Sequence, residues 1–305
     1  MEKMQNNNEI NIHNVQSIRN LKIDYPDIYF TPEYGIACQY SDNAEWECCI
    51  YRDLMFVYLK KKYLDENNEI YYELLTPYGY SGYYFEKEET FNDFLDKFRE
   101  IKKIKKYKKE IIRQNPYLNV KCNNIINNKY NVIGEKHLYY VHTNSFNDYF
   151  KNRRSKQRNI YRKGVKLNLK FDKYTLNKYN LNQLKFINFY EKSLEEKNAD
   201  KYYYFNTNYF EYLCKLNGYI CIIRNVENKI ISGCIILNHN YFNHYHLSFT
   251  NKSYNCATDF LLMNIIKNIT IGKTFVLGCG IFDGDSLGRF KKHLSTNNVK
   301  YKIFN

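Results

Sequence analysis

The sequence lacks the features that define several large classes of protein. No run of about 18 consecutive apolar residues occurs, which argues against a membrane-spanning helix. The N-terminal residues 1–8 are polar and charged with no apolar stretch behind them, so no secretory signal is predicted. We therefore expect a cytoplasmic protein.

The cysteines show no spacing that predicts cross-links or metal binding. The number is odd, at nine, no Cys-x-x-Cys pair occurs, and Cys48 and Cys49 are adjacent. We interpret the cysteines as small core residues. The Walker loop, the Gly-x-Ser-x-Gly elbow, the His-Glu-x-x-His motif and the kinase motifs are also missing, so the sequence predicts no metal site and none of those reactions.

Composition predicts a folded chain but leaves its partner open. With 44% hydrophobic residues, 33 Tyr and 20 Phe, the chain has ample material for a core. Lys and Arg number 46 and Asp and Glu 32, which gives a net charge of +14. This excess fits an anionic partner such as RNA, a nucleotide-linked precursor or an acidic membrane face. An AT-rich genome, which favours Lys, Asn, Ile and Tyr, explains the excess equally well.

The length of 305 residues predicts two domains. We expect an N-terminal domain over residues 1–145, whose residues 1–20 form a polar arm, and a C-terminal domain over 146–297. Residues 298–305 are expected to form a closing strand that pairs back to the N-terminal domain. Strands alternate with helices around an antiparallel hairpin, which predicts a mixed α/β fold.

Three segments in the first half carry specific predictions. Residues 28–34 are expected to form a strand that enters a turn, and residues 117–141 to form strands with Asn-rich turns. Residues 90–111 repeat apolar side chains at helical spacing and predict one helix. The lysines between 102 and 109 lie on its other face, as a solvated surface or as a contact for phosphates.

A second basic cluster runs from Lys151 to Lys166 and is richer in arginine. Guanidinium groups bind phosphate and carboxylate in pairs, so this cluster is the better candidate for an anion site. Arg158 is its expected ligand-binding member.

Residues 241–249 alternate as a β-strand, with Tyr245 and Leu247 on one face and His244 and His246 on the other. Two histidines make a weak metal site. A packed structural role and a place in a substrate cleft, where a neutral imidazole relays a proton, are both compatible with this spacing.

Short motifs in a fixed order give the sequence a family resemblance. Together they resemble the Fem-type (FemABX) peptidyltransferases and related GNAT-like acyltransferases over roughly residues 25–300. The motifs are Asp27–Tyr34, Thr76–Gly82, Ile112–Asn119, Tyr202–Phe205, Tyr245–Ser248 and Leu277–Gly280 followed by Ser286–Ser295.

The resemblance implies two tandem GNAT-like domains with a substrate cleft between them. It implies an acyl- or aminoacyl-transferase that acts on an amine of a cell-envelope precursor, either a peptidoglycan peptide or an amino sugar of a surface glycan. The implied donor is aminoacyl-tRNA or acyl-CoA, with no permanently bound cofactor. The implied partners are an anionic envelope precursor or a nucleotide-linked sugar, and tRNA and the inner membrane face stay open. No stable protein partner is inferred.

The resemblance also implies the site residues. The family's Phe-Lys pair corresponds to Phe290 and Lys291, where the ammonium stabilises an oxyanion and the ring shields the site from water. Glycines in a loop let the backbone approach a ligand, which adds the loop that contains Gly79. The residues expected to bind substrate are Ser193, Tyr204, Tyr245, His246, Tyr78, Gly79, Tyr80 and Arg158.

The sequence departs from the family at three places. The family's Thr-Met-x-Arg stretch is Ser193–Lys197 here, which removes an arginine suited to an anionic acceptor, and Cys279 stands where glycine is usual. Residues 251–256 lack the turn that holds the pyrophosphate of coenzyme A in ordinary GNAT enzymes, which argues against a standard acetyl-CoA site. A non-catalytic RNA-binding module of basic and aromatic residues is the alternative hypothesis.

Overall fold

The computed structural model describes residues 8–305. The chain divides into two compact units. Of the described residues, unit 1 holds 8–136, 206–213 and 299–305, and unit 2 holds 137–205 and 214–298. Within the described residues no helix is long and apolar enough to cross a membrane.

Unit 1 contains a sheet with the strand order β1-β2-β3-β4-β6-β13, and β5 pairs with β3. Neighbouring strands are antiparallel except β4 and β6, which run parallel. The strands are β1 (Asn11–Asn14), β2 (Glu45–Tyr51), β3 (Leu54–Leu64), β4 (Ile70–Leu75), β5 (Gly82–Tyr84), β6 (Tyr107–Arg113) and β13 (Asn297–Phe304).

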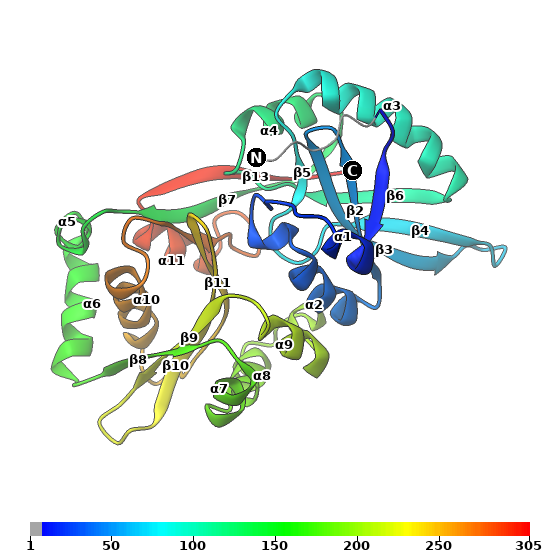
Figure 1. The fold of residues 1–305 in the computed structure, drawn as a ribbon. Helices are drawn as coiled ribbons and strands as arrows, with labels where there is room; N and C mark the ends of the chain where they lie inside the picture. Colours follow the sequence, from blue (N-terminus) through cyan, green and yellow to red (C-terminus); the bar gives the residue numbers. More distant parts are fainter. Residues whose placement is uncertain (1–7) are drawn as a thin grey trace. The chain divides into compact units, whose positions relative to one another are not determined.

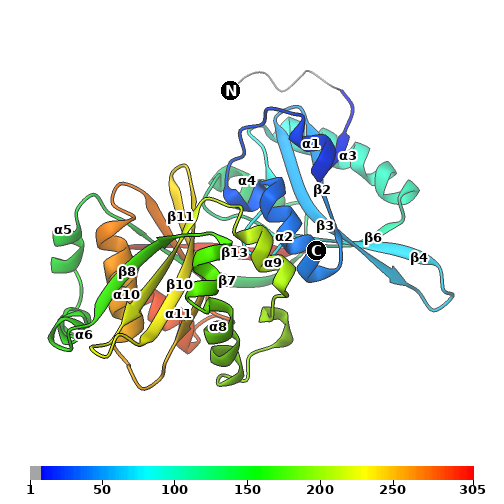
Figure 2. The ribbon, with the colours of Figure 1, turned by 60° about the horizontal axis from the view of Figure 1, so that its bottom comes forward.

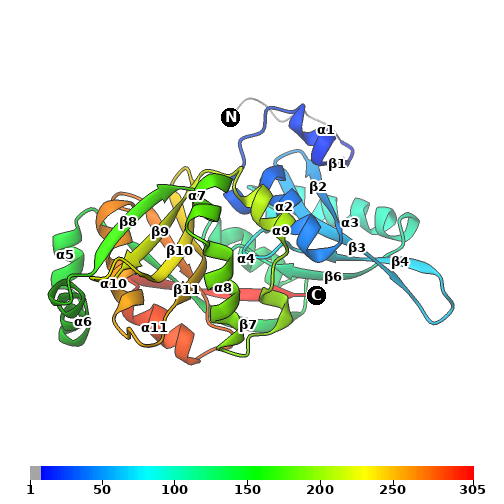
Figure 3. The same ribbon diagram turned by 90° about the horizontal axis from the view of Figure 1, so that it is seen from below.

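Helices cover both faces of the unit 1 sheet (Figure 1). Those on one face enclose an aromatic core in which the rings of Phe56 and Tyr83 stack at 4.0 Å. On the other face α9 packs beside α2, although the two are far apart in sequence (Figure 3). The helices are α1 (Val15–Arg19), α2 (Pro32–Asp42), α3 (Glu88–Ile104), α4 (Val120–Asn127) and α9 (Thr207–Leu213), with a 3-10 helix at Ile28–Phe30.

Unit 2 contains a sheet with the strand order β7-β12-β11-β10-β9-β8. Here β11 and β12 are the parallel pair, and the other neighbours are antiparallel. The strands are β7 (Val132–His142), β8 (Lys170–Thr175), β9 (Gly218–Arg224), β10 (Ile230–His239), β11 (Phe242–Thr250) and β12 (Thr274–Gly278). The helices are α5 (Phe146–Lys151), α6 (Ser155–Lys166), α7 (Lys178–Gln183), α8 (Phe186–Glu195), α10 (Ala257–Asn268) and α11 (Ser286–Leu294), with a 3-10 helix at Lys201–Tyr203.

The two faces of the unit 2 sheet carry different helices (Figure 2). The buried helix α10 packs over one face and joins its apolar residues to those of β9, β10 and β12. Helix α8 packs over the other face, where Phe186 and Phe189 contact the ring of Phe249 at 5.2 and 5.1 Å between centroids. Side chains on β11 therefore reach different neighbours according to the face from which they project.

The units repeat one plan. Each has a largely antiparallel sheet with one parallel pair of strands whose connection contains a helix. The connection is β4–β5–α3–β6 in unit 1 and β11–α10–β12 in unit 2. A crossover helix is the usual way to connect parallel strands. This duplication confirms the predicted mixed α/β fold.

Two predictions for the first half are wrong because capping residues outweigh strand propensity. Residues 28–34 form a 3-10 turn and the start of α2, since the Thr31 hydroxyl accepts a hydrogen bond from the Tyr34 N–H and Pro32 occupies the first helical turn. Residues 120–127 form α4 inside the segment expected to be all strand. Its N-cap is Asn119, whose side chain accepts hydrogen bonds from the N–H groups of Lys121 and Cys122.

The helix predicted over 90–111 ends early, at Ile104. Lys106 takes a positive φ of 55° and reverses the chain, after which Tyr107 begins β6. The expected polar arm is also partly wrong, because Asn11–Asn14 pair with β2 and Ile18 is buried. Residues 1–7 of that arm lie outside the described residues.

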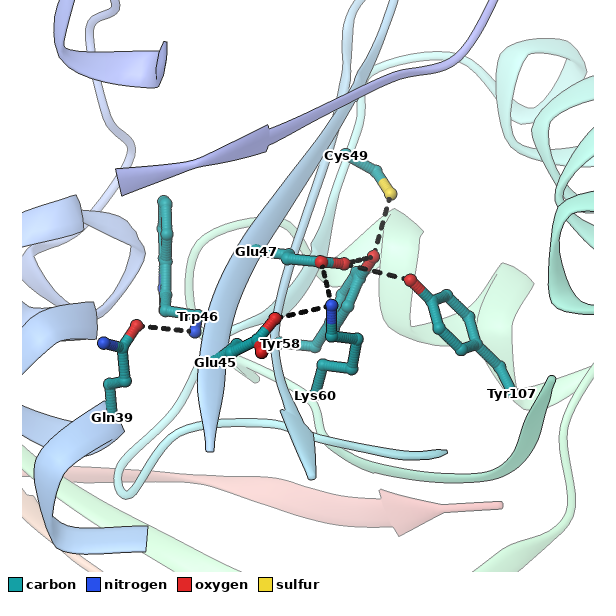
Figure 4. Close-up of polar contacts among 8 residues, drawn as sticks. All are labelled: Gln39, Glu45, Trp46, Glu47, Cys49, Tyr58, Lys60 and Tyr107. Carbon is teal, nitrogen blue, oxygen red and sulfur yellow. Dashed lines mark hydrogen bonds and ion pairs between the residues drawn. The ribbon is translucent and has the colours of Figure 1, made fainter. Parts of the chain in front are cut away.

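A buried ion pair lies on β2 and β3 of unit 1 (Figure 4). The carboxylate of Glu47 is 8% exposed as a residue and accepts hydrogen bonds from the hydroxyls of Tyr58 at 2.8 Å and Tyr107 at 3.1 Å. The Lys60 ammonium lies 2.7 Å from the same carboxylate and 2.6 Å from the outer carboxylate of Glu45. Two hydroxyls and an ammonium thus donate to the Glu47 carboxylate, which supplies the partners that a buried carboxylate requires.

Lys60→Met is expected to destabilise the protein by roughly 2–4 kcal/mol, because Glu47 keeps its charge and loses its cation. The matched control is Glu45→Gln. The Glu45 side chain is 69% exposed, so loss of its charge is expected to change the free energy of unfolding by less than about 0.5 kcal/mol. Urea unfolding followed by circular dichroism measures both. Equal effects of the two substitutions would show that the buried pair contributes nothing beyond surface charge.

Candidate functional site

Lys291 occupies the buried side of α11 in unit 2. Its residue exposure is 8%, and its Nζ donates a hydrogen bond of 2.7 Å to the carbonyl oxygen of Cys279. The same Nζ lies 6.0 Å from the ring centroid of Tyr245 on β11. The structure therefore brings together Lys291, Tyr245 and the residue that follows β12.

The loop between β12 and α11 is organised by Asp285. Its carboxylate caps α11 by accepting from the Gly288 N–H and also accepts from the N–H groups of Ile281 and Phe282. Gly280 allows this closure, since a Cβ at that position would lie 2.1 Å from the Asp285 carboxylate. The capped loop fixes the carbonyl of Cys279 opposite Lys291.

Burial shapes the charges at this centre. It lowers the pKa of Lys291 to about 8, against the opposing influence of Cys279 and the carboxylate of Asp285. Burial acts to raise the pKa of Asp285, but backbone N–H donors and the charge of Lys291 outweigh it and lower that pKa overall. Lys291 is thus a cation held close to the point of losing its proton, beside a firmly ionised carboxylate.

The strands β11 and β12 separate next to this lysine. Their parallel register runs from Phe242–Thr274 to His244–Val276, after which β11 continues beside β10 and β12 continues beside β7. Opposite Ile235 and Ile236 the register of β11 shifts by one residue, a β-bulge at His246. The bulge directs Tyr245 toward the α10 core and Leu247 to the other face, so the prediction that they share a face is wrong.

His246 is buried beside His244. Burial, aided by His244, lowers the pKa of His246 to about 3, so its imidazole is neutral near physiological pH. Burial also raises the pKa of Tyr245 far above its ordinary value. Neither side chain therefore carries charge near physiological pH.

Phe290 faces the core of unit 2, where it packs against the cluster formed by α10 and the strands. It anchors α11 and thereby sets the direction of the next residue, Lys291. Two other expected ligands lie away from this pair. Ser193 is buried on α8, and its Oγ has no hydrogen-bond partner among residues 8–305. Tyr204 ends the 3-10 turn after α8 and is 38% exposed.

Arg158 stabilises the turn between α5 and α6. Its guanidinium donates to the carbonyl oxygens of Lys151 at 2.9 Å and Arg153 at 2.7 Å. These bonds stabilise the turn, and the same nitrogen makes both.

The glycine-rich loop lies in unit 1 and packs among tyrosines. Gly79 has a positive φ of 104°, and a Cβ there would approach the ring of Tyr29 to 2.7 Å. The carbonyl of Tyr78 accepts from the Tyr34 hydroxyl at 2.6 Å, and the ring of Tyr80 contacts Tyr301 edge-on at 5.1 Å. A packing requirement thus explains the glycine without a ligand.

The N-terminus of α10 is poorly suited to a pyrophosphate. The Ala257 N–H donates to the Tyr254 carbonyl and the Phe260 N–H to the Cys256 carbonyl. The Asp259 carboxylate lies in the first turn and accepts from its own N–H, and burial raises its pKa to about 6. An acidic side chain therefore lies in the first turn, the part of a helix where its dipole would otherwise favour a bound anion.

Among residues 8–305 no group of three or more His, Cys, Asp or Glu side chains is placed to share a metal ion. All nine cysteines are free thiols, and eight of them are buried, as expected for core residues.

Sequence analysis missed Asp285, although an aspartate one residue before Ser286 and three before Gly288 is a recognisable helix cap.

Lys291→Met is expected to remove a pH dependence of stability. Between about pH 8 and 10.5 the unfolded lysine keeps its proton while the folded one loses it, so wild-type stability rises with pH in this window. Relative to Lys291→Met, the wild type should gain roughly 2–3 kcal/mol across it. Urea unfolding of both proteins at each end of the window tests this, and a constant difference would contradict the lowered pKa.

Comparison with known proteins shows the fold. No protein-family model and no curated protein matches the chain by sequence. The crystal structure of FemX matches with a TM-score of 0.65 and 12% identity over 99% of this chain and 97% of that one. The C-terminal domain of a putative lysylphosphatidylglycerol synthetase from Agrobacterium fabrum matches with a TM-score of 0.58 and 12% identity over 95% and 90%. The structure of L-PGS from Bacillus licheniformis matches with a TM-score of 0.58 and 14% identity over 88% of this chain and 86% of that one. The chain thus has the fold of FemX, as the sequence motifs predicted.

Proposed function

We propose that this protein transfers an aminoacyl or acyl group from an activated donor to an amine of a cell-envelope precursor. The observation that carries the proposal is the buried ammonium of Lys291, which is fixed at the point where β11 and β12 separate. The fold likeness to FemX and to proteins named for lysylphosphatidylglycerol synthesis supports the same reaction class.

The chemistry follows from the position of Lys291. The amine nitrogen of the acceptor attacks the carbonyl carbon of the donor ester, and the new C–N bond leaves a negative charge on the carbonyl oxygen. The Lys291 ammonium stabilises that oxyanion, and its burial strengthens the attraction. The C–O bond to the donor then breaks, and the departing oxygen takes up the proton that the amine releases. The ring of Tyr245, which lies 6.0 Å from the Lys291 Nζ, is a neutral hydrogen-bonding group beside it.

Aminoacyl-tRNA is the favoured donor. At the start of α10 the N–H groups of Ala257 and Phe260 donate to carbonyl oxygens of the chain, and the first turn carries Asp259, so it offers little to the pyrophosphate of coenzyme A. The net charge of +14 suits a polyanionic donor. Acyl-CoA is the second candidate.

An anionic acceptor finds support at the end of α8. Burial lowers the pKa of Lys197, and the charge of Lys252 lowers it further. Lys252 also donates to the carbonyl of Glu196 at 2.6 Å. A bound anion would relieve this repulsion, so Lys197 supplies the positive charge that the family's arginine provides near Ser193. A peptidoglycan peptide and an amino sugar linked to a nucleotide both fit.

A donor-competition assay tests the function. Purified protein is given labelled aminoacyl-tRNA or labelled acetyl-CoA, with a nucleotide-linked peptidoglycan peptide or an amino-sugar glycoside as acceptor. Transfer is expected from the tRNA ester, and Lys291→Met is expected to lower kcat by about 10²–10³ because the oxyanion loses its cation. The rate should also decline above about pH 8, where Lys291 loses its proton.

The matched control is Lys267→Met, an exposed lysine in the last turn of α10, which should leave the rate unchanged. Transfer by Lys291→Met at the wild-type rate would remove the proposed role of this lysine. Tight RNA binding without transfer from either donor would favour the non-catalytic RNA-binding module.

A further inference from the structure

Asp259 is a carboxylate near the proposed reaction centre with no cation paired to it. It lies in the first turn of α10 and is half-buried. No Lys or Arg among residues 8–305 forms an ion pair with Asp259, and within those residues its carboxylate accepts a hydrogen bond only from its own N–H. Lys156, which is exposed on α6, acts on it from beyond ion-pair distance. The carboxylate is therefore open to a positively charged ligand.

Asp259 and Lys291 belong to helices that pack over the same face of the unit 2 sheet. The apolar residues of α10 and α11 form one cluster over that face, and Tyr245 packs against it. The ring centroid of Tyr245 lies 6.0 Å from the Lys291 Nζ. Burial is the main cause of the raised pKa values of Tyr245 and Tyr149, and the charge of Asp259 adds to both. The Asp259 carboxylate thus acts on the tyrosine that lies beside Lys291.

Helix stability does not explain this carboxylate. An acidic residue in the first turn of a helix is ordinarily stabilised by the helix dipole, which favours its charged form. For Asp259 burial is the larger influence and raises the pKa to about 6, although its own N–H and Lys156 act in the opposite direction. The charged carboxylate therefore lowers the stability of the folded protein at neutral pH, because folding removes it from water. A destabilising charge beside a reaction centre is typical of a group that binds a ligand.

We propose that Asp259 binds the free α-ammonium of an aminoacyl donor, and that it thereby selects an aminoacyl ester over an acyl group without an amine. This inference rests on the proposed transfer reaction. Lys291 attracts the carbonyl oxygen of the donor and repels its ammonium, whereas Asp259 attracts the ammonium. The two opposite charges orient the donor, and the same carboxylate disfavours the pyrophosphate of coenzyme A.

An aminoacyl group has a length that suits this arrangement. Its α-nitrogen and its carbonyl oxygen are roughly 3 Å apart, as ordinary bond lengths dictate. With a charge-assisted hydrogen bond at each end, it would bridge a carboxylate and an ammonium roughly 8–9 Å apart. Lys291 and Asp259 form no ion pair with each other, and Tyr245 lies near both. The two charges are thus near one another without neutralising each other.

Two stable donor analogues test the binding step without chemistry. The first probe is 3′-alanylamido-3′-deoxyadenosine, in which an amide replaces the reactive ester. The second is its N-acetyl derivative, which lacks the ammonium. Isothermal titration calorimetry with the full-length protein is expected to show that the first binds roughly ten- to a hundredfold more tightly, as one charge-assisted hydrogen bond predicts. Equal affinities for the two probes, or binding of neither, would overturn the inference.

Asp259→Asn is expected to remove this preference by weakening the first probe alone. The matched control is Asp148→Asn, an exposed aspartate in the first turn of α5, which should keep the preference. Thermal unfolding separates binding from structure. Because burial disfavours the charged carboxylate, Asp259→Asn should unfold at the wild-type temperature or above it. An unchanged preference in Asp259→Asn, with a lowered unfolding temperature, would assign this residue a structural role and refute the proposal.

Transfer assays separate this inference from the proposed function. Wild-type preference for the free ammonium without transfer to any acceptor would leave the inference in place and remove the function. Transfer from N-acetylaminoacyl-tRNA as fast as from aminoacyl-tRNA would support the function and contradict the inference. Lys291→Met should keep the preference of the wild type for the first probe while it fails to transfer.

Discussion

The hydrogen bond from the Lys291 ammonium to the Cys279 carbonyl joins the end of β12 to α11, and the proposed chemistry depends on it. It forms because Asp285 closes the intervening loop with its two carboxylate oxygens and because Gly280 leaves room for them. Phe290, one residue earlier on α11, is held in the core and turns Lys291 inward. A carbonyl is a partner that cannot neutralise the lysine, so its charge stays available for a developing oxyanion.

Ion pairing with carboxylates, rather than composition, decides which positive charges of this chain can attract an anion. The lysines near α3 lie among carboxylates from β4, β6 and the β3–β4 turn, and exposed pairs of this kind contribute little and attract little. On α11, Arg289 donates to the carbonyl oxygen of Gly284, and neither Arg289 nor Lys292 forms an ion pair with a carboxylate among residues 8–305. A net charge of +14 therefore does not by itself locate an anion site.

The sequence predicted the elements that depend on local pattern and missed those that depend on a single residue or on distant partners. The hairpin of β9 and β10 and helices α10 and α11 follow from periodicity, and the structure confirms them. The turn at Lys106 and the bulge at His246 need a backbone conformation that side-chain periodicity does not encode. Arg158 lies in a basic cluster and Gly79 in a glycine-rich loop, and both patterns predicted ligand binding. The hydrogen bonds of Arg158 and the packing of Gly79 show structural roles that the sequence pattern does not encode.

Burial sets the property of Lys291 on which the proposed reaction depends. It lowers the pKa of the ammonium to about 8, and the charge of Asp285 opposes that shift. The proposed stabilisation of an oxyanion therefore requires Asp285 to stay ionised. The N–H donors of Ile281, Phe282 and Gly288 favour the ionised carboxylate and lower its pKa. The cap of α11 thus has two effects, because it closes the loop and it holds the carboxylate that helps to keep the lysine charged.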